Sequence, residues 1–377
     1  MKARERRGLL LAFGVFGVFW GAWSATLPAL RLQVGASDGE LGLALAAIAV
    51  AAVPVMPVAG RMVDRFGARR MLPASLLVFA LAVPMPALAH SLTELVLAAA
   101  LLGVATGALD LVANAATAAW ERIEQDAAMS VVHGSFSVGV LVGASTAGLA
   151  RDAGGTPRLI LPVVAVLVLV VGLTQPAYRT AERDAERSLR RRLPRVLVGI
   201  GLLVALAFLC EDAIQSWSAL HLERGLGASP GVSGLGPGLF AGAMAVGRFA
   251  GGPLSRRHSP RRMLAVASAV LALGAFVVAA APNAGTALAG LVVAGLGTSV
   301  LAPVLYSVVG SRAAQGRQGA DLAAVSVLGY VGFVAGPPLV GAVSAASSLP
   351  TAIACLGGLG LVLAVTGPLL LSGKMRA

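Results

Sequence analysis

The chain has 377 residues, of which 57% are hydrophobic and only 12% are charged, and its formal net charge is +12. Such an apolar composition excludes a water-soluble globular protein. The positive charge does not indicate nucleic-acid binding, because the basic residues collect in alternate loops between apolar segments. We therefore expect an all-α protein that crosses the lipid bilayer many times and binds no nucleic acid.

Apolar segments follow one another along almost the whole chain, each close to the length of about 20 residues that a helix needs to cross a bilayer. The short polar loops between them favour helices over the period-2 pattern of outer-membrane β-strands. Little sequence is left for a soluble domain. We predict twelve transmembrane helices, at residues 8–30, 40–60, 71–90, 93–119, 129–150, 157–177, 196–220, 231–254, 263–281, 284–309, 319–345 and 349–372.

The basic residues indicate which loops face the cytoplasm, because cytoplasmic loops carry an excess of Lys and Arg. With twelve spans, most basic residues lie on one side, and the arginines on the other side are Arg31, Arg151, Arg158 and Arg224. Both termini are therefore predicted to be cytoplasmic. The basic start resembles a signal peptide, but the apolar run after it is too long and lacks a small-residue cleavage site, so we expect it to remain as the first helix.

A short basic loop lies between the second and third spans and holds Gly60, Asp64, Arg65, Gly67, Arg69 and Arg70. This spacing resembles the Gly-x-x-x-Asp-Arg-x-Gly-x-(Arg/Lys)-(Arg/Lys) loop between helices 2 and 3 of the major facilitator superfamily. A damaged copy in the second half of the chain keeps Gly252, Arg261 and Arg262, but it has Arg256 in place of the aspartate.

Other short strings also recur between the two halves. Trp-Ser-Ala at 23–25 recurs at 217–219, and Gly-x-x-x-Gly at 139–143 recurs at 332–336. Glycines with this spacing let a neighbouring helix approach closely, which we expect of the eleventh span. The recurrences agree with the resemblance in predicting an internal repeat of six spans.

The resemblance implies the superfamily's fold, in which two six-helix halves share one orientation and a substrate cavity lies near the midplane. We place the halves at residues 1–178 and 196–377, joined by a charged cytoplasmic linker at 179–195. Three further strings, at 37–42, 133–137 and 211–219, are similar to a bacterial branch distantly related to fucose permeases. That similarity implies a multi-pass protein of the bacterial cytoplasmic membrane.

The loop at Asp64 has two interpretations. Its carboxylate could accept hydrogen bonds from a helix N-terminus while the arginines hold helix ends or acids, which would lock one conformer and release in the other. Alternatively, the arginines only fix the topology. We expect a gate, to which Arg248 of the eighth span also belongs, although Arg248 could instead extend to the membrane surface. The gating candidates are Gly60, Asp64, Arg65, Gly67, Arg69, Arg70 and Arg248.

The fourth span carries a polar stripe. Thr106, Asp110 and Asn114 are spaced i, i+4, i+8 and so share one face. An ionisable side chain at a helix centre costs on the order of 2.5–3.5 kcal/mol, which makes Asp110 a functional candidate. It could bind a cationic or hydroxylated substrate or share in proton transfer. The alternative is a hydrogen-bonded brace between helices.

The seventh span carries Glu211 and Asp212, with Gln215 and Ser218 on the face of Glu211. The resemblance implies that helices 1, 4, 7 and 10 line the cavity. A carboxyl group in apolar surroundings there is suited to taking up and releasing a proton. We favour Glu211 as the coupling acid, with Asp212 and Asp110 as further candidates. The alternative is a carboxylate that braces a broken helix.

Trp20 is a candidate for the cavity wall, because an indole ring can stack on a sugar or an aromatic ligand. Trp23 and Trp217 lie near the outer ends of their spans, where we expect them to belong to an aromatic belt at the membrane surface. The candidates for the substrate cavity are thus Trp20, Thr106, Asp110, Asn114, Glu211, Gln215 and Ser218.

These residues favour a secondary transporter that moves a small organic solute by alternating access, coupled to protons in symport or antiport. Ala144 stands where antiporters of the superfamily typically place a proline, so symport and an uncoupled facilitator stay open. A non-transporting sensor or scaffold is a further alternative. The scattered histidines hold no metal-ligand motif, so we expect no enzyme, metal or other cofactor. We expect a monomer whose partners are the substrate, protons and the bilayer.

Overall fold

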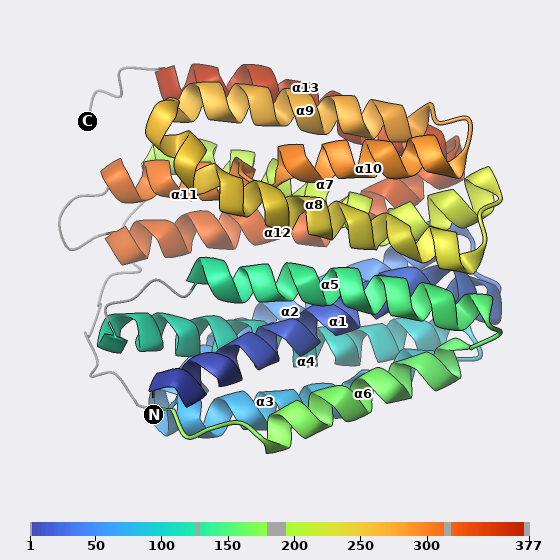
Figure 1. Cartoon of the computed structure of the whole chain (residues 1–377), viewed down its shortest axis with the longest axis horizontal. Coiled ribbons are helices and arrows are strands. Elements are labelled where there is room, and N and C mark those ends of the chain that lie inside the picture. Colours follow the sequence, from blue (N-terminus) through green and yellow to red (C-terminus); the bar gives the residue numbers. More distant parts are fainter. Residues whose placement is uncertain (1, 125–128, 179–193, 313–317, 373–377) are drawn as a thin grey trace. The chain divides into compact units, whose positions relative to one another are not determined.

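The computed structural model describes residues 2–124, 129–178, 194–312 and 318–372 (Figure 1). The predicted linker at 179–195 lies outside these residues except for its last two positions. Every regular element within the described part is helical. The prediction of an all-α chain is confirmed.

The elements that precede the linker are α1 (Lys2–Val34), α2 (Asp38–Phe66), α3 (Ala68–Ala82), η1 (Met85–Leu88), α4 (Leu92–Glu124), α5 (Met129–Asp152) and α6 (Pro157–Leu173). The third span was predicted to reach residue 90, but α3 ends at Ala82 and a 3-10 turn follows. Pro84 and Pro86 explain the difference, because proline has no N–H to continue an α-helix.

The elements that follow the linker are α7 (Arg195–Leu220), η2 (His221–Gly225), α8 (Pro230–Arg257), α9 (Pro260–Ala279), α10 (Ala284–Thr298), α11 (Leu301–Arg312), α12 (Gln318–Ala346) and α13 (Leu349–Ser372). The short η2 is a π-helical turn. The predicted tenth span is divided into α10 and α11. At the division, the hydroxyls of Thr298 and Ser299 donate hydrogen bonds to backbone carbonyls of α10, a local pattern that competes with a regular helix.

Ten helical segments in the described part are long and apolar enough to cross a membrane, and α10 with α11 counts as one of them. Together with α6, a shorter apolar helix of 17 residues, and the 28-residue α8, they occupy the twelve predicted spans. Ends differ by several residues, as is usual where helices extend beyond the bilayer.

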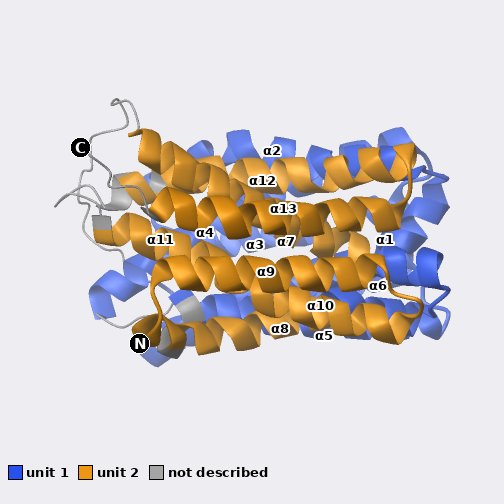
Figure 2. Cartoon of the chain, turned by 90° about the horizontal axis from the view of Figure 1, so that it is seen from above, with its two compact units in different colours: residues 1–183, 219–238 blue, residues 184–218, 239–377 orange. Residues whose placement is uncertain are grey.

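The chain forms two compact units (Figure 2). Unit 1 comprises residues 1–183 and 219–238, and unit 2 comprises residues 184–218 and 239–377. Both α7 and α8 therefore contribute to both units. We call residues 219–238, which join these two helices and belong to unit 1, the α7–α8 corner.

Glycines bring the helices of each unit close together. In unit 1, a Cβ on Gly139 or Gly143 of α5 would overlap the backbone of α1. In unit 2, a Cβ on Gly332 of α12 would overlap the backbone of α7 at Ala205. The Gly-x-x-x-Gly strings thus serve the same purpose in both repeats, and the close approach predicted for the eleventh span is confirmed.

Candidate functional site

Asp110 and Asn114 lie one turn apart on α4, and both side chains are half-buried. The Asn114 amide nitrogen donates hydrogen bonds to the Asp110 carboxylate at 3.0 Å and to the Asp110 carbonyl at 2.9 Å. The Asn114 amide oxygen lies 3.3 Å from Nε2 of His133 on α5. The i, i+4 spacing predicted that Asp110 and Asn114 share one face, and the first contact lies on that face. His133 joins through the packing of α5 on α4, which the sequence pattern did not reveal.

Thr106 is placed differently from the other two residues of the predicted stripe. It is buried, and its hydroxyl donates a hydrogen bond of 3.1 Å to the carbonyl of Gly103 in its own helix. A Cβ on Gly103 would overlap the backbone of Ile48, so α4 lies very close to α2 here. Thr106 is therefore a buried residue one turn from this close contact, and it is less accessible than Asp110 and Asn114.

Trp20 is half-buried on α1 and is held by other aromatic rings. Phe16 and Phe19 meet it edge to face, with ring centroids 6.2 and 5.3 Å from that of Trp20. Both phenylalanines also contact Phe79 of α3 edge to face. This cluster fixes the orientation of the indole, and part of the Trp20 side chain stays exposed.

The predicted aromatic belt positions of Trp23 and Trp217 are wrong. The two side chains are only 2% and 1% exposed, so protein atoms cover them instead of lipid headgroups. Trp23 stacks on Phe19 with a centroid distance of 6.1 Å. The equivalent positions of these tryptophans in the two repeats therefore reflect core packing, which periodicity alone could not separate from a place at the membrane surface.

In unit 2, Glu211 of α7 pairs with Arg248 of α8. Arg248 Nη2 donates a hydrogen bond of 3.3 Å to Glu211 Oε1, and the two side chains are 21% (Glu211) and 25% (Arg248) exposed. The pairing lowers the cost of each charge within an apolar helix bundle. One predicted coupling acid and one predicted gating residue are thus in direct contact. Asp212 is also half-buried.

The rest of the predicted α7 face is less open. Gln215 is half-buried, whereas Ser218 is 2% exposed and its hydroxyl donates to the Gln215 carbonyl at 3.4 Å. Ser218 also lies beside a narrow apolar gap, which is lined by Ile214, Trp217, Ala275, Val278, Leu291 and Ile353.

The predicted gating loop is a sharp joint between two helices. Gly67 alone separates α2 from α3, and its φ of 75° lies in the left-handed region that favours glycine. Asp64 and the arginines of this loop are exposed, and Arg65 lies 5.3 Å above the ring of Phe66. Arg69 and Arg70 occupy the first turn of α3, where positive charge is unfavourable to the helix dipole. Helix stability therefore does not explain these two arginines.

A charged cluster that sequence analysis did not identify as a site lies at the end of unit 1 that is opposite the Asp64 joint. It is formed where α1 ends, α2 begins and α5 ends. It contains three of the four arginines that the topology prediction placed on the outer side. These pair with two carboxylates, one on α2 and one in the α7–α8 corner. We call this set the charged cluster; its members are Arg31, Asp38, Arg151, Glu223 and Arg224. The sequence signal that could have revealed this cluster is the position of its three arginines, which are exceptions to the positive-inside rule.

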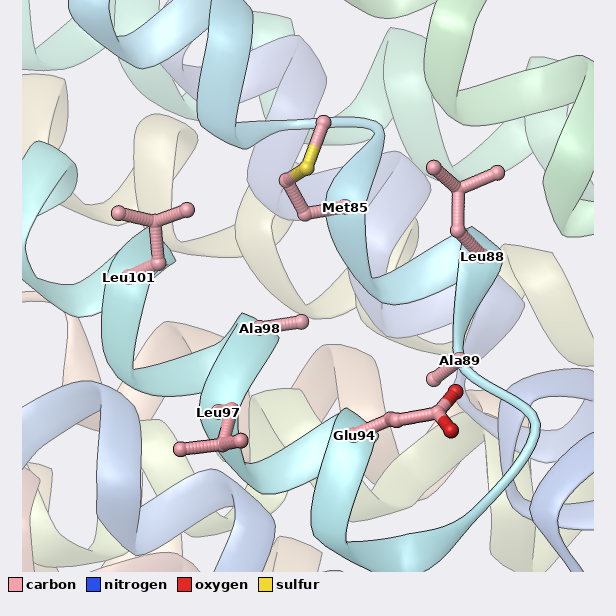
Figure 3. A pocket seen from close by; sticks show the side chains of 7 residues that line it. All are labelled: Met85, Leu88, Ala89, Glu94, Leu97, Ala98 and Leu101. Carbon is pink, nitrogen blue, oxygen red and sulfur yellow. The ribbon is translucent and has the colours of Figure 1, made fainter.

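A surface pocket of about 300 Å³ lies between η1 and the start of α4 (Figure 3). Its walls are apolar, and Glu94 lies at one side. The Glu94 carboxylate accepts a hydrogen bond from the His90 backbone at 2.8 Å. None of the residues predicted from the sequence to bind substrate lines this pocket. Its leucines belong to the exposed apolar surface of the unit, as expected where a membrane protein faces lipid.

Comparison with known proteins identifies the family. The model of the Major Facilitator Superfamily matches twice, over residues 9–210 and 200–375. The chain belongs to the major facilitator superfamily. An MFS-type transporter of Yersinia pestis is 28% identical over 94% of this chain and 93% of its own. The membrane protein MosC of Rhizobium meliloti is 29% identical over 93% of this chain and 86% of its own.

Solved structures of the superfamily share the fold. The nucleoside transporter NupG, as its D323A mutant, has a TM-score of 0.81 at 13% identity and covers 97% of this chain and 99% of its own. A bacterial homologue of the human lysosomal transporter Spinster, in an inward-facing and occupied conformation, has a TM-score of 0.73 at 18% identity, with 98% and 97% coverage. The predicted superfamily fold is therefore confirmed.

Membership of the major facilitator superfamily establishes the general role of the chain. It is a multi-pass membrane protein of a family that transports small molecules and is generally not enzymatic. The fold does not determine the substrate, the coupling ion or the direction of transport, because these depend on the residues of the binding site.

Proposed function

We propose that the chain is a proton-coupled secondary transporter that moves a small organic solute across a bacterial inner membrane by alternating access. The observation that carries this proposal is Glu211, a half-buried carboxylate that lies inside α7 and is held by Arg248. Intramembrane acids are rare because they are costly, and they commonly belong to proton or substrate pathways.

Each unit offers polar groups for this task. In unit 1, Trp20, Asp110 and Asn114 are half-buried and could contact a solute with both apolar and polar parts. In unit 2, Glu211, Asp212 and Gln215 are half-buried on α7. We assign proton coupling to Glu211, with Asp212 and Asp110 as alternative proton carriers. Thr106 and Ser218 are buried, and their hydroxyls donate hydrogen bonds within their own helices. We assign these two residues to the packing of α4 and α7 next to the polar groups.

The transport cycle would move two halves, residues 1–178 and 196–377, about the linker at 179–195. We assign the joint around Gly67, with Gly60, Asp64, Arg65, Arg69 and Arg70, to the gate on the cytoplasmic side. Charged side chains on an exposed joint can form and break interfacial contacts as helices move. Arg248, which pairs with Glu211, would link this movement to protonation.

Transport is tested in proteoliposomes that contain the purified protein. A thermal-shift screen first finds compounds that bind the folded state. We expect one of these compounds to accumulate when a pH gradient is imposed. Counterflow without proton movement would instead establish an uncoupled facilitator. Binding with no movement of any compound would contradict transport and favour a sensor or scaffold.

Orientation is a separate prediction. We expect both termini and the linker to be cytoplasmic, because most basic residues then lie inside. An impermeant thiol reagent applied to intact cells should label Gly155→Cys and Asn283→Cys, but label Ser188→Cys only after the membrane is opened. The background needs Cys210→Ala and Cys355→Ala, because both cysteines are free thiols. Labelling of Ser188→Cys in intact cells would overturn the twelve-span orientation.

A further inference from the structure

The α7–α8 corner is attached to unit 1 even though the rest of α7 and α8 belongs to unit 2 (Figure 2). The chain enters the corner at Ala219 and leaves it after Gly238. Movement of unit 2 must therefore either bend these two helices or detach the corner from unit 1. The contacts that attach the corner decide which movement is possible.

The first attachment is a two-pronged ion pair between α5 and the corner. Nη1 and Nη2 of Arg151 each donate a hydrogen bond of 2.8 Å to the Glu223 carboxylate. Nη1 also donates to the carbonyl of Ala25 on α1 at 2.9 Å, and Ser233 donates its hydroxyl to Glu223 at 3.0 Å. The Arg151 side chain is only 6% exposed. Paired hydrogen bonds of this geometry are strong and specific.

The second attachment is centred on Asp38. A capping box of Ser37 and Glu40 begins α2 at this point and so fixes the position of Asp38. Its carboxylate accepts a hydrogen bond from Arg224 of the corner, and Arg31 Nε of α1 lies 3.2 Å from the same oxygen. One carboxylate thus holds two guanidinium groups together. Without it, the two arginines would repel each other.

Glycines beneath these ion pairs let the backbones of α5 and the corner meet closely. A Cβ on Gly148 of α5 would overlap Gly234 of α8, and one on Gly231 would overlap the carboxylate of Asp152. Contact between glycine backbones and charged groups separates more readily than an interlocked apolar core, because water can solvate the exposed polar groups. The π-helical turn that carries Glu223 and Arg224 is a type of local distortion frequent at functional sites.

We infer that the charged cluster is a latch that closes the chain on the side opposite the Asp64 joint, and that each transport cycle requires its release. This inference rests on the proposed alternating-access function and adds to it a second gate with named residues. Asp38 and Glu223 hold the closed state. Gly148 and Gly234 allow the backbones to meet.

The latch is tested by measuring distances within unit 1 and the corner, which needs no substrate. Spin labels are placed at Leu32→Cys on α1 and Ser229→Cys in the corner, both exposed positions, in the Cys210→Ala, Cys355→Ala background. Double electron–electron resonance in nanodiscs should show mainly one short distance. We expect Glu223→Gln and Asp38→Asn each to raise the fraction of a longer distance by at least about threefold.

Arg158→Gln is the matched control, because it removes an arginine at the same end of unit 1 whose contacts are Ala87 and His90. It should leave the distances unchanged. Exchange of the charges in the double variant Arg151→Glu, Glu223→Arg should restore the short distance that each single change weakens. If Glu223→Gln does not fold, Ser233→Ala, which removes the hydroxyl that donates to Glu223 and to the Pro230 carbonyl, should give a smaller shift in the same direction.

Unchanged distances in both Glu223→Gln and Asp38→Asn would overturn the latch, and so would an equal shift in Arg158→Gln. These outcomes differ from failure of the proposed function. A chain that shows the expected distances but moves no compound in proteoliposomes has the latch without the transport. A chain that accumulates solute with unchanged distances transports without this latch.

Discussion

Glu211→Gln is expected to abolish accumulation driven by a pH gradient while substrate exchange at equal pH continues. The amide has the shape of the protonated carboxyl group but cannot release a proton, so the solute is no longer tied to proton movement. A gradient of one pH unit supports roughly tenfold accumulation for each coupled proton, and this should fall to simple equilibration. Uptake and counterflow are measured in proteoliposomes at equal protein content.

Asp212→Asn is the matched control, because it makes the same chemical change at the next position, about 100° around the helix. We expect a milder effect, since the ion pair with Arg248 is made by Glu211. Undiminished accumulation in Glu211→Gln would remove this residue from coupling and make Asp110 the next candidate. A variant that fails to insert or fold would favour the brace interpretation.

Gly332→Ala is expected to lower the stability of unit 2 strongly for the addition of one methyl group. Its Cβ would overlap the carbonyl group of Ala205 on α7, and backbone atoms cannot move aside as a flexible side chain can. Overpacking of this kind typically costs about 1–3 kcal/mol. The measurement is the thermal unfolding midpoint in detergent, together with the yield of monodisperse protein.

Gly358→Ala on α13 provides the control, because a Cβ there would meet nothing within 4 Å. Alanine also favours a helix by about 1 kcal/mol relative to glycine, so this variant should be neutral or slightly more stable. Equal midpoints for the two variants would mean that α7 and α12 are not closely packed at Gly332.

The positions of the helices could be predicted from sequence because the bilayer sets both their length and their composition. The interruptions were less predictable. The end of α3 depends on prolines whose effect extends only a few residues, and the division between α10 and α11 involves two hydroxyls that are ordinary in a membrane helix. Neither feature changes the average hydropathy of its segment.

A shared face within one helix could be predicted from spacing, as the hydrogen-bonded Asp110 and Asn114 demonstrate. Contacts between distant segments could not, because no periodicity relates Arg248 to Glu211 or Arg151 to Glu223. The four arginines that the topology prediction placed on the outer side were nevertheless visible as exceptions to the charge rule. An exception of this kind is a reason to look for a carboxylate partner, since an arginine on the translocated side must have another cause than topology.

The deep burial of Trp217 has an optical consequence. The chain has four tryptophans, and Trp217 lies in unit 2, shortly before Ala219 begins the α7–α8 corner. An indole that protein atoms cover emits at shorter wavelengths than one in water. With phenylalanine in place of Trp20, Trp23 and Trp120, the colour of the remaining emission would follow, in real time and without an added dye, how the protein environment changes where α7 passes from one unit to the other.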